Sequence, residues 1–249
     1  MLTAFHQRTL ELADRRRETV AHSEAIVREL EAALRQAIPA SFRELLVSNL
    51  WPNLLTEFSN CDQPIELRDM LRPQCRKHSA VGAGVLPFMV ENQGVCTWAI
   101  RLQGADDPEV LVEVDSGEPP EWQPAAPTFS EWLNCQVHDH ILVQRALFAA
   151  QAEPLTTAML ADLERTFSVG PRTYGWPTPV VHRFSNSAGA ILLWAGDDQC
   201  DWWVAPTSLD QARDLLDALP PSGGFDGCSY ELKPEALPVF DAWRKAMPR

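Results

Sequence analysis

The sequence predicts an α+β protein: a mainly antiparallel sheet flanked by helices, preceded by a long N-terminal helix and followed by a C-terminal α/β extension. Three observations indicate this class. Residues 2–37 contain no proline or glycine, residues 85–114 hold short apolar segments, and helical and strand patterns alternate again after residue 156. With 249 residues, 45% of them hydrophobic, the chain can bury a core. We divide it into residues 1–37, 38–150 and 151–249.

The N-terminal half of the chain begins with predicted helices. Residues 2–37 are dominated by Glu, Ala, Leu and Arg, which favour helix, and the helix is expected to end before Pro39. A second, short helix is expected at residues 40–57. Ser41 would be its N-cap, and Glu44 would complete a capping box three residues later.

Three strands are expected next, at residues 85–90, 94–102 and 109–114. The first two are joined by a tight polar turn that ends in Gly94. In the third strand apolar and acidic residues alternate, which predicts one buried and one exposed face. Its three valines share the buried face, and Leu111 lies among the acids on the exposed face.

A proline-rich loop and a helix at residues 128–150 complete the middle segment. We expect the C-terminal segment to extend this body across a broad interface. Its predicted elements are a helix at 156–167, strands at 180–185, 189–195 and 200–205, and helices at 207–219 and 234–246. In the last of these strands the successive residues Trp202 and Trp203 should face opposite sides. The expected core of the middle segment includes Val95, Ile100, Val110, Val112, Phe129 and Leu133.

Charge is unevenly distributed along the chain, which carries 21 basic and 34 acidic residues and a net charge of −13. Residues 105–144, called the acidic stretch below, contain no Lys or Arg. The stretch is either a solvated face or a surface for a basic partner. Direct nucleic-acid binding is not expected, because it requires a basic footprint. The nine acids of the stretch are Asp106, Asp107, Glu109, Glu113, Asp115, Glu118, Glu121, Glu131 and Asp139.

Three segments between residues 37 and 142 predict, in order, the start of a helix, a hairpin, and a strand followed by a closing helix. Residues 38–46 (IPASFRELL) place a proline and an aromatic residue at the start of a helix. Residues 86–100 form a hairpin, and residues 107–112 followed by 128–133 supply a third strand and a closing helix. In this order and spacing the segments resemble the SUKH superfamily, which includes the Smi/Knr-type yeast cell-wall regulators and many bacterial immunity proteins.

The resemblance implies a binding module without enzymatic activity, which neutralises a cognate bacterial toxin, for example a basic nuclease, by direct association. An acidic surface suits such a partner, because complementary charge raises association rates. A regulatory scaffold that binds several cellular proteins is the alternative, and an uncharacterised enzyme is a third. We assign partner binding to six residues: Asp106, Asp107, Glu109, Glu113, Asp115 and Trp122.

Catalytic, cofactor and metal sites are not expected. The sequence contains no P-loop, no G-x-S-x-G and no G-x-G-x-x-G motif. Cys135, His138 and His140 resemble metal ligands in type, but residues five apart on a helix point in different directions. No apolar segment is long enough for a membrane span, and no signal peptide is recognisable, so we expect a cytoplasmic protein.

Overall fold

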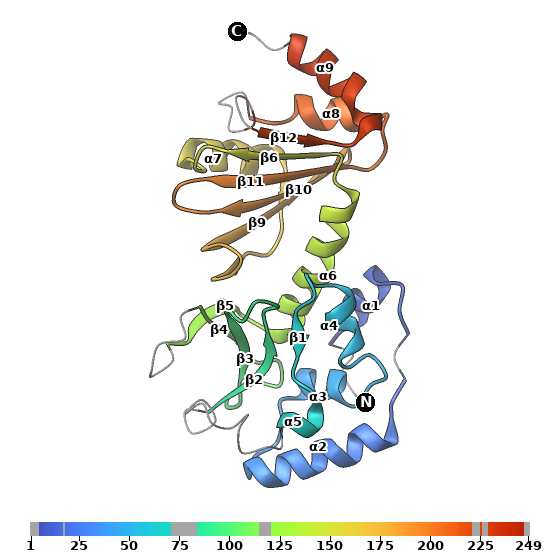
Figure 1. Cartoon of the computed structure of the whole chain (residues 1–249), viewed down its shortest axis with the longest axis vertical. Coiled ribbons are helices and arrows are strands. Elements are labelled where there is room, and N and C mark those ends of the chain that lie inside the picture. Colours follow the sequence, from blue (N-terminus) through green and yellow to red (C-terminus); the bar gives the residue numbers. More distant parts are fainter. Residues whose placement is uncertain are drawn as a thin grey trace. The chain divides into compact units, whose positions relative to one another are not determined.

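The computed structural model describes residues 5–16, 18–70, 84–114, 121–220, 225 and 229–246. It divides the chain into two units, residues 1–140 and 141–249, each a mixture of helices and antiparallel strands (Figure 1). The division falls inside helix α6 (Phe129–Arg145). The predicted boundary at residue 150 instead lies within a strand of the second unit, β6 (Phe148–Ala152).

The N-terminal segment forms two helices, so the predicted long helix is wrong. The helices are α1 (Gln7–Leu12) and α2 (Ala21–Leu34). Between them Asp14 adopts a left-handed backbone with φ of 51°, and the N–H of Val20 donates to the carbonyl of Val47 at 2.8 Å. The polar middle of the segment offers no apolar face to bury, and helices in proteins depend on such burial for most of their stability.

The predicted second helix is also divided, into α3 (Ala40–Leu46) and α4 (Asn53–Glu57). Ser48 lies where α3 has ended. Its Oγ donates to the carbonyl of Leu45 at 2.6 Å and accepts from the N–H of Leu50 at 3.2 Å. A serine that binds nearby backbone groups in this way competes with continued helix formation.

The first unit contains a five-stranded antiparallel sheet in the order β1-β2-β3-β4-β5. The predicted bounds of β2 are confirmed. The segment predicted as a proline-rich loop contains β5, in which Ala126 pairs with Val110 of β4. The elements are β1 (Gln63–Pro64), α5 (Leu67–Met70), β2 (Val85–Val90), β3 (Thr97–Arg101), β4 (Val110–Glu113) and β5 (Gln123–Ala126).

A cluster of buried aromatic rings joins one face of this sheet to α3 and α6. The ring centroid of Phe42 in α3 lies 5.0 Å from that of Phe129 in α6. Trp132 of α6 lies 5.0 Å from Phe88 of β2 and 6.0 Å from Trp98 of β3. Most of these pairs meet edge to face, the geometry that the quadrupoles of aromatic rings favour. The predicted packing of two helices on one face of the sheet is therefore confirmed for α3 and α6.

The opposite face of β4 is covered as well. Leu111 is 1% exposed and packs with Val85, Ala99 and the half-buried Trp122. The prediction that this face is open to solvent is therefore wrong for Leu111, because Trp122 lies over it, whereas Glu109 and Glu113 on the same face are partly exposed.

Two valines that we expected to be buried are exposed. Val95 and Val114 each expose 40% of their surface. Val95 belongs to the turn before β3, and Val114 lies beyond the last residue of β4, so neither occupies a core-facing strand position. The other predicted core residues are buried: Ile100, Val110, Val112, Phe129 and Leu133.

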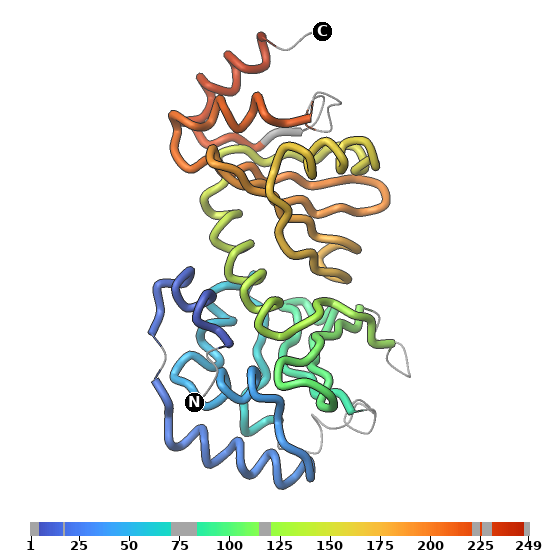
Figure 2. The backbone as a smooth tube through the Cα atoms, turned by 180° about the vertical axis from the view of Figure 1, so that it is seen from behind, coloured from blue at the N-terminus to red at the C-terminus, as the bar shows by residue number. Residues whose placement is uncertain are grey.

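The second unit contains a seven-stranded antiparallel sheet in the order β12-β6-β11-β10-β9-β7, with β8 paired to β9. Figure 2 shows the strands β6 to β11 of this sheet from behind, in yellow to orange. The predicted bounds of two strands are confirmed, β9 (Val180–Ser185) and β10 (Gly189–Ala195). The remaining strands are β7 (Ser168–Val169), β8 (Thr173–Tyr174), β11 (Cys200–Pro206) and β12 (Ser229–Leu232).

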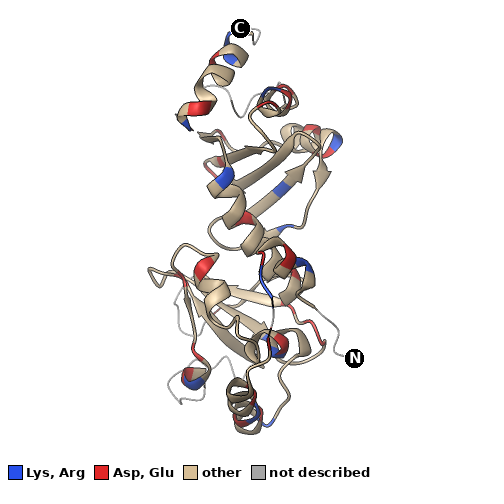
Figure 3. Ribbon diagram, turned by 90° about the vertical axis from the view of Figure 1, so that its right-hand side faces the viewer, with Lys and Arg blue, Asp and Glu red and all other residues tan. Residues whose placement is uncertain are grey.

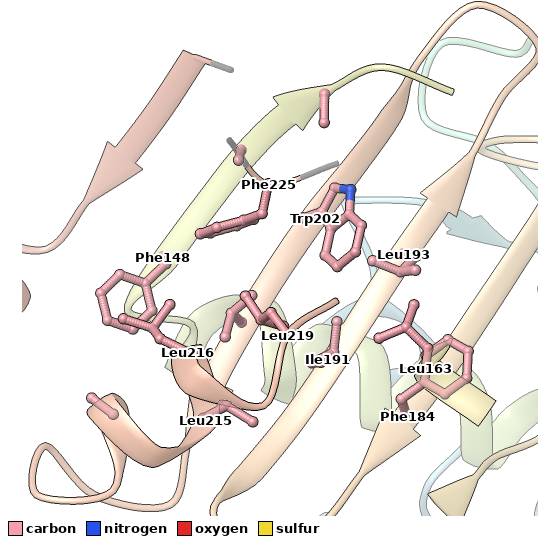
Figure 4. Packing of buried hydrophobic residues seen from close by; sticks show 14 of the residues in the cluster. Phe148, Leu163, Phe184, Ile191, Leu193, Trp202, Leu215, Leu216, Leu219 and Phe225 are labelled. Atoms are coloured by element: carbon pink, nitrogen blue, oxygen red, sulfur yellow. The ribbon is translucent and has the colours of Figure 1, made fainter. Parts of the chain in front are cut away.

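Three helices pack against one face of this sheet. They are α7 (Thr157–Thr166), α8 (Ala212–Asp217) and α9 (Leu237–Ala246), the last preceded by the 3-10 turn Pro234–Ala236. Figure 4 shows the buried side chains between them, including Trp202 of β11. Trp202 is 1% exposed, whereas Trp203 is half-buried on the other face, so the prediction that these two rings face opposite sides is confirmed.

Candidate functional site

The acidic stretch retains its contact with solvent in the folded chain. Seven of its nine acids lie within the described residues, and none of these seven is buried. Asp106 and Glu121 are exposed, and the other five are partly exposed. Acidic and basic residues occur in both units (Figure 3). The stretch itself has no Lys or Arg to neutralise its carboxylates.

Asp107 is tied into the start of α6. Its Oδ1 accepts the N–H of Ser130 at 3.0 Å, and its Oδ2 accepts the Ser130 hydroxyl. The Oγ1 of Thr128 accepts the N–H of Glu131 at 3.2 Å. The first N–H groups of a helix lack partners within the helix, and a negative charge at this end is favourable. Asp107, assigned to partner binding from the sequence, therefore has a structural role.

Glu109 forms an ion pair with Arg101 of the neighbouring strand, with 3.1 Å between Oε2 and Nε. The side chain of Arg101 is 47% exposed and that of Glu109 is 32% exposed. Exposed pairs of this kind contribute about 0–1 kcal/mol to stability. Glu109 consequently still contributes to the surface potential, although its charge is partly offset by Arg101.

The other predicted binding residues differ in their placement. Glu113 is partly exposed at the end of β4, opposite Thr97 of β3. Asp115 lies outside the described residues. Trp122 is half-buried against the sheet, and its indole N–H is buried and finds no hydrogen-bond partner among the described groups. Trp122 therefore covers β4 while keeping part of its surface exposed, and its assignment to partner binding stays a prediction.

The three metal-like residues of α6 do not converge. Cys135 is buried, Nδ1 of His138 lies 3.1 Å from Oδ1 of Asp139, and the His140 ring packs edge to face against Phe58. Within the described part of the chain, no group of three or more His, Cys, Asp and Glu residues could hold a metal ion.

A pair of buried carboxyl groups at the β2–β3 turn escaped the sequence analysis. Oδ1 of Asp62 accepts the N–H of Asn92 at 3.1 Å, and Oε2 of Glu91 accepts the N–H of Gln93 at 2.7 Å. The pKa of Asp62 is raised to about 6, mainly by burial. The hydrogen bond from Asn92 opposes this rise, and the charge of Glu91 contributes to it. Because both carboxyls are bound to the backbone of the turn, we interpret them as parts of the turn.

A second feature missed from the sequence lies on the sheet of the second unit. A hollow of about 310 Å³ opens on the face opposite α8 and α9, around Ala149, Gln151, Asp201, Trp203 and Glu231. The period of β11 already places Asp201 and Trp203 on one face. The other lining residues belong to β6 and β12, two strands that the sequence analysis did not find, so their position next to Trp203 could not be predicted.

In comparisons with known proteins, no family model, curated protein or solved structure matches the chain. Among the helices of the described residues, none is both long and apolar enough to cross a membrane.

Proposed function

We propose that the chain is a non-enzymatic protein-binding module of the bacterial cytoplasm, an immunity protein that neutralises a cognate toxin by direct association. The partner surface is basic, as in a nuclease domain. The observation that carries this proposal is the acidic stretch, in which all seven described acids keep access to solvent and no Lys or Arg is interspersed. The resemblance to the SUKH superfamily supplies the class of function.

Exposed carboxylates attract a basic partner before contact is made. Carboxylates in water attract a basic partner over about one Debye length, roughly 8 Å at physiological ionic strength. Such charges increase the association rate and discriminate against partners of like charge. Asp106 and Glu121 are the clearest contributors, because both are exposed. Asp107 and Glu109 contribute less, since each has a partner within the chain.

Co-expression with the product of the adjacent open reading frame tests this function. The chain should copurify with that product in a 1:1 complex and abolish its toxicity. The variant Asp106→Lys with Glu121→Lys should weaken both effects. A matched control, Glu153→Lys with Asp241→Lys, makes the same change in net charge at exposed positions of the second unit and should leave both effects intact.

The alternatives give different results in the same experiment. A chain that binds no neighbouring product but several housekeeping proteins would be the regulatory scaffold. Toxicity that is relieved without a stoichiometric complex would indicate chemistry on the toxin or its product, as an enzyme would perform. Either result would contradict the proposed function.

A further inference from the structure

The hollow on the second sheet results from one small residue between two large ones. Ala149 of β6 lies directly opposite Trp203 of β11 on one side and directly opposite Glu231 of β12 on the other. Neighbouring strands are about 4.8 Å apart, so Trp203 and Glu231 are separated by roughly 10 Å with only a methyl group between them. The half-buried indole therefore forms one wall of the hollow, and an exposed carboxylate stands at the other.

A second carboxylate lies on the same face. Asp201 is two residues from Trp203 on β11, and it pairs with Gln151 of β6. The Nε2 of Gln151 donates to Oδ1 of Asp201 at 3.4 Å, which keeps the carboxylate beside the hollow. Among the described residues that line the hollow, two are acidic and none is basic. The lining thus combines an aromatic face with two carboxylates.

The opposite side of the Trp203 ring is already occupied. Its centroid lies 4.0 Å from that of Trp194 on β10, and the two rings pack with Leu142 and Leu192. The Trp203 ring is therefore supported from that side. An aromatic wall that is already positioned loses little conformational entropy when a ligand contacts it.

We propose that this hollow binds the guanidinium group of an arginine side chain, presented by a basic segment of a partner protein. A guanidinium is planar, stacks on an indole face and donates paired hydrogen bonds to carboxylates. Trp203 supplies the stacking face, and Asp201 and Glu231 supply the acceptors. Lysine fits less well, because its ammonium group is a strongly hydrated point charge without a planar face. The inference does not rest on the proposed function, and its test requires no toxin.

The experiment is a titration of the full chain against a fluorescein-labelled peptide in which arginine alternates with glycine and serine, followed by fluorescence anisotropy. Matched peptides carry citrulline, which is neutral and nearly isosteric, or lysine. The arginine peptide should bind tightest and the citrulline peptide should not bind measurably. Trp203→Leu should weaken arginine binding by about three- to tenfold. Asp201→Asn with Glu231→Gln should weaken it by about tenfold or more.

Control variants separate the site from general attraction to an acidic chain. Asp214→Asn with Asp241→Asn removes two exposed charges from α8 and α9, the helices that pack against the opposite face of the sheet, and should change binding less than twofold. Trp203→Phe keeps an aromatic ring and should restore most of the binding lost in Trp203→Leu. If Trp203→Leu fails to fold, the proposal is still tested by Trp203→Phe and by comparing Asp201→Asn with Glu231→Gln against the control pair. Equal binding of the lysine peptide, or equal weakening by the control pair, would overturn the proposal.

Discussion

Asp107 illustrates, at the scale of a single residue, how a carboxylate can belong to an acidic surface and yet stabilise the fold. Its two oxygens bind the backbone and the hydroxyl of Ser130 in the first turn of α6. Asp107→Ala leaves an N–H of that turn without this acceptor. The free energy of unfolding should fall by about 1 kcal/mol, the usual cost of losing a helix cap. Urea denaturation of the full chain measures this change.

The matched variant for Asp107 is Asp107→Asn, which keeps an oxygen acceptor for Ser130 but loses the charge. It should retain more than half of the stability that Asp107→Ala loses. If the alanine variant is as stable as the native chain, the hydrogen bonds to Ser130 contribute nothing and Asp107 is only a surface charge. This structural role is also the reason why Asp107 is a poor position for charge reversal in a binding experiment.

Sequence reasoning at this scale succeeded where the strand period alone decides the outcome. The opposite orientations of Trp202 and Trp203 follow from alternation along β11 and were predicted. The burial of Leu111 was not predicted, because it depends on Trp122, a residue outside β4 that covers Leu111. Alternation shows which residues share a face, but it does not show whether another part of the chain lies over that face.

At the scale of an element, the β2–β3 turn should make stability depend on pH through Asp62. The native pKa of about 6 lies above the ordinary value of 3.8, so the native state holds the proton more tightly than the unfolded state. The stabilising contribution of the protonated carboxyl is therefore complete below about pH 4 and is lost as the pH rises through 6. A tenfold difference in proton affinity corresponds to about 1.4 kcal/mol.

Asp62→Asn tests this dependence because the amide oxygen can still accept the N–H of Asn92. The variant should be more stable than the native chain at pH 7, and this advantage should disappear near pH 4. Urea denaturation at both pH values gives the comparison. Asp106→Asn, at an exposed acid of the same unit, is the control. If Asp62→Asn changes the free energy of unfolding by the same amount at both pH values, the raised pKa is contradicted.

His182 should produce the opposite dependence. Its pKa is lowered from an ordinary 6.5 to about 4, mainly by burial in β9 and in part by Arg172 and Arg183, while Glu164 opposes this shift. The native state therefore resists protonation, and the stabilising contribution present above pH 6.5 is lost as the pH falls through 4. His182→Leu removes the titrating group, so unfolding free energies at pH 7 and pH 5 should differ less in the variant. An unchanged difference would contradict this account.

The elements that were predicted with correct bounds share a clear period and a clear end. β2 and β10 consist mainly of apolar residues, β9 carries His182 and Arg183 among apolar residues, and a polar turn follows each of the three strands. β6 was missed because its sequence, FAAQA, continues the helix-favouring composition of α6, and only pairing with β11 and β12 makes it a strand. The N-terminal helix was overextended for the converse reason: its composition favours helix throughout, whereas its middle has no apolar face to pack.

At the scale of the whole molecule, the uneven distribution of charge is the feature that sequence alone describes best. The concentration of acids in the acidic stretch can be counted without a structure. The sequence does not show which of those acids stabilise the fold and which only contribute surface charge, because this depends on which of them contact Ser130 or Arg101 in the folded chain. For the same reason the arginine site could not be predicted, since its lining brings together strands distant in the sequence.

The central claim, that the acidic stretch guides a basic protein partner to this chain, is tested most directly by association kinetics. The rate constant for binding the copurified toxin is measured by stopped flow for the native chain, for Asp106→Lys with Glu121→Lys, and for the control Glu153→Lys with Asp241→Lys. The first pair should slow association by about tenfold or more at low ionic strength, with a smaller effect as salt increases, while the control pair changes it little. Equal rate constants for the two double variants at every salt concentration would contradict the claim.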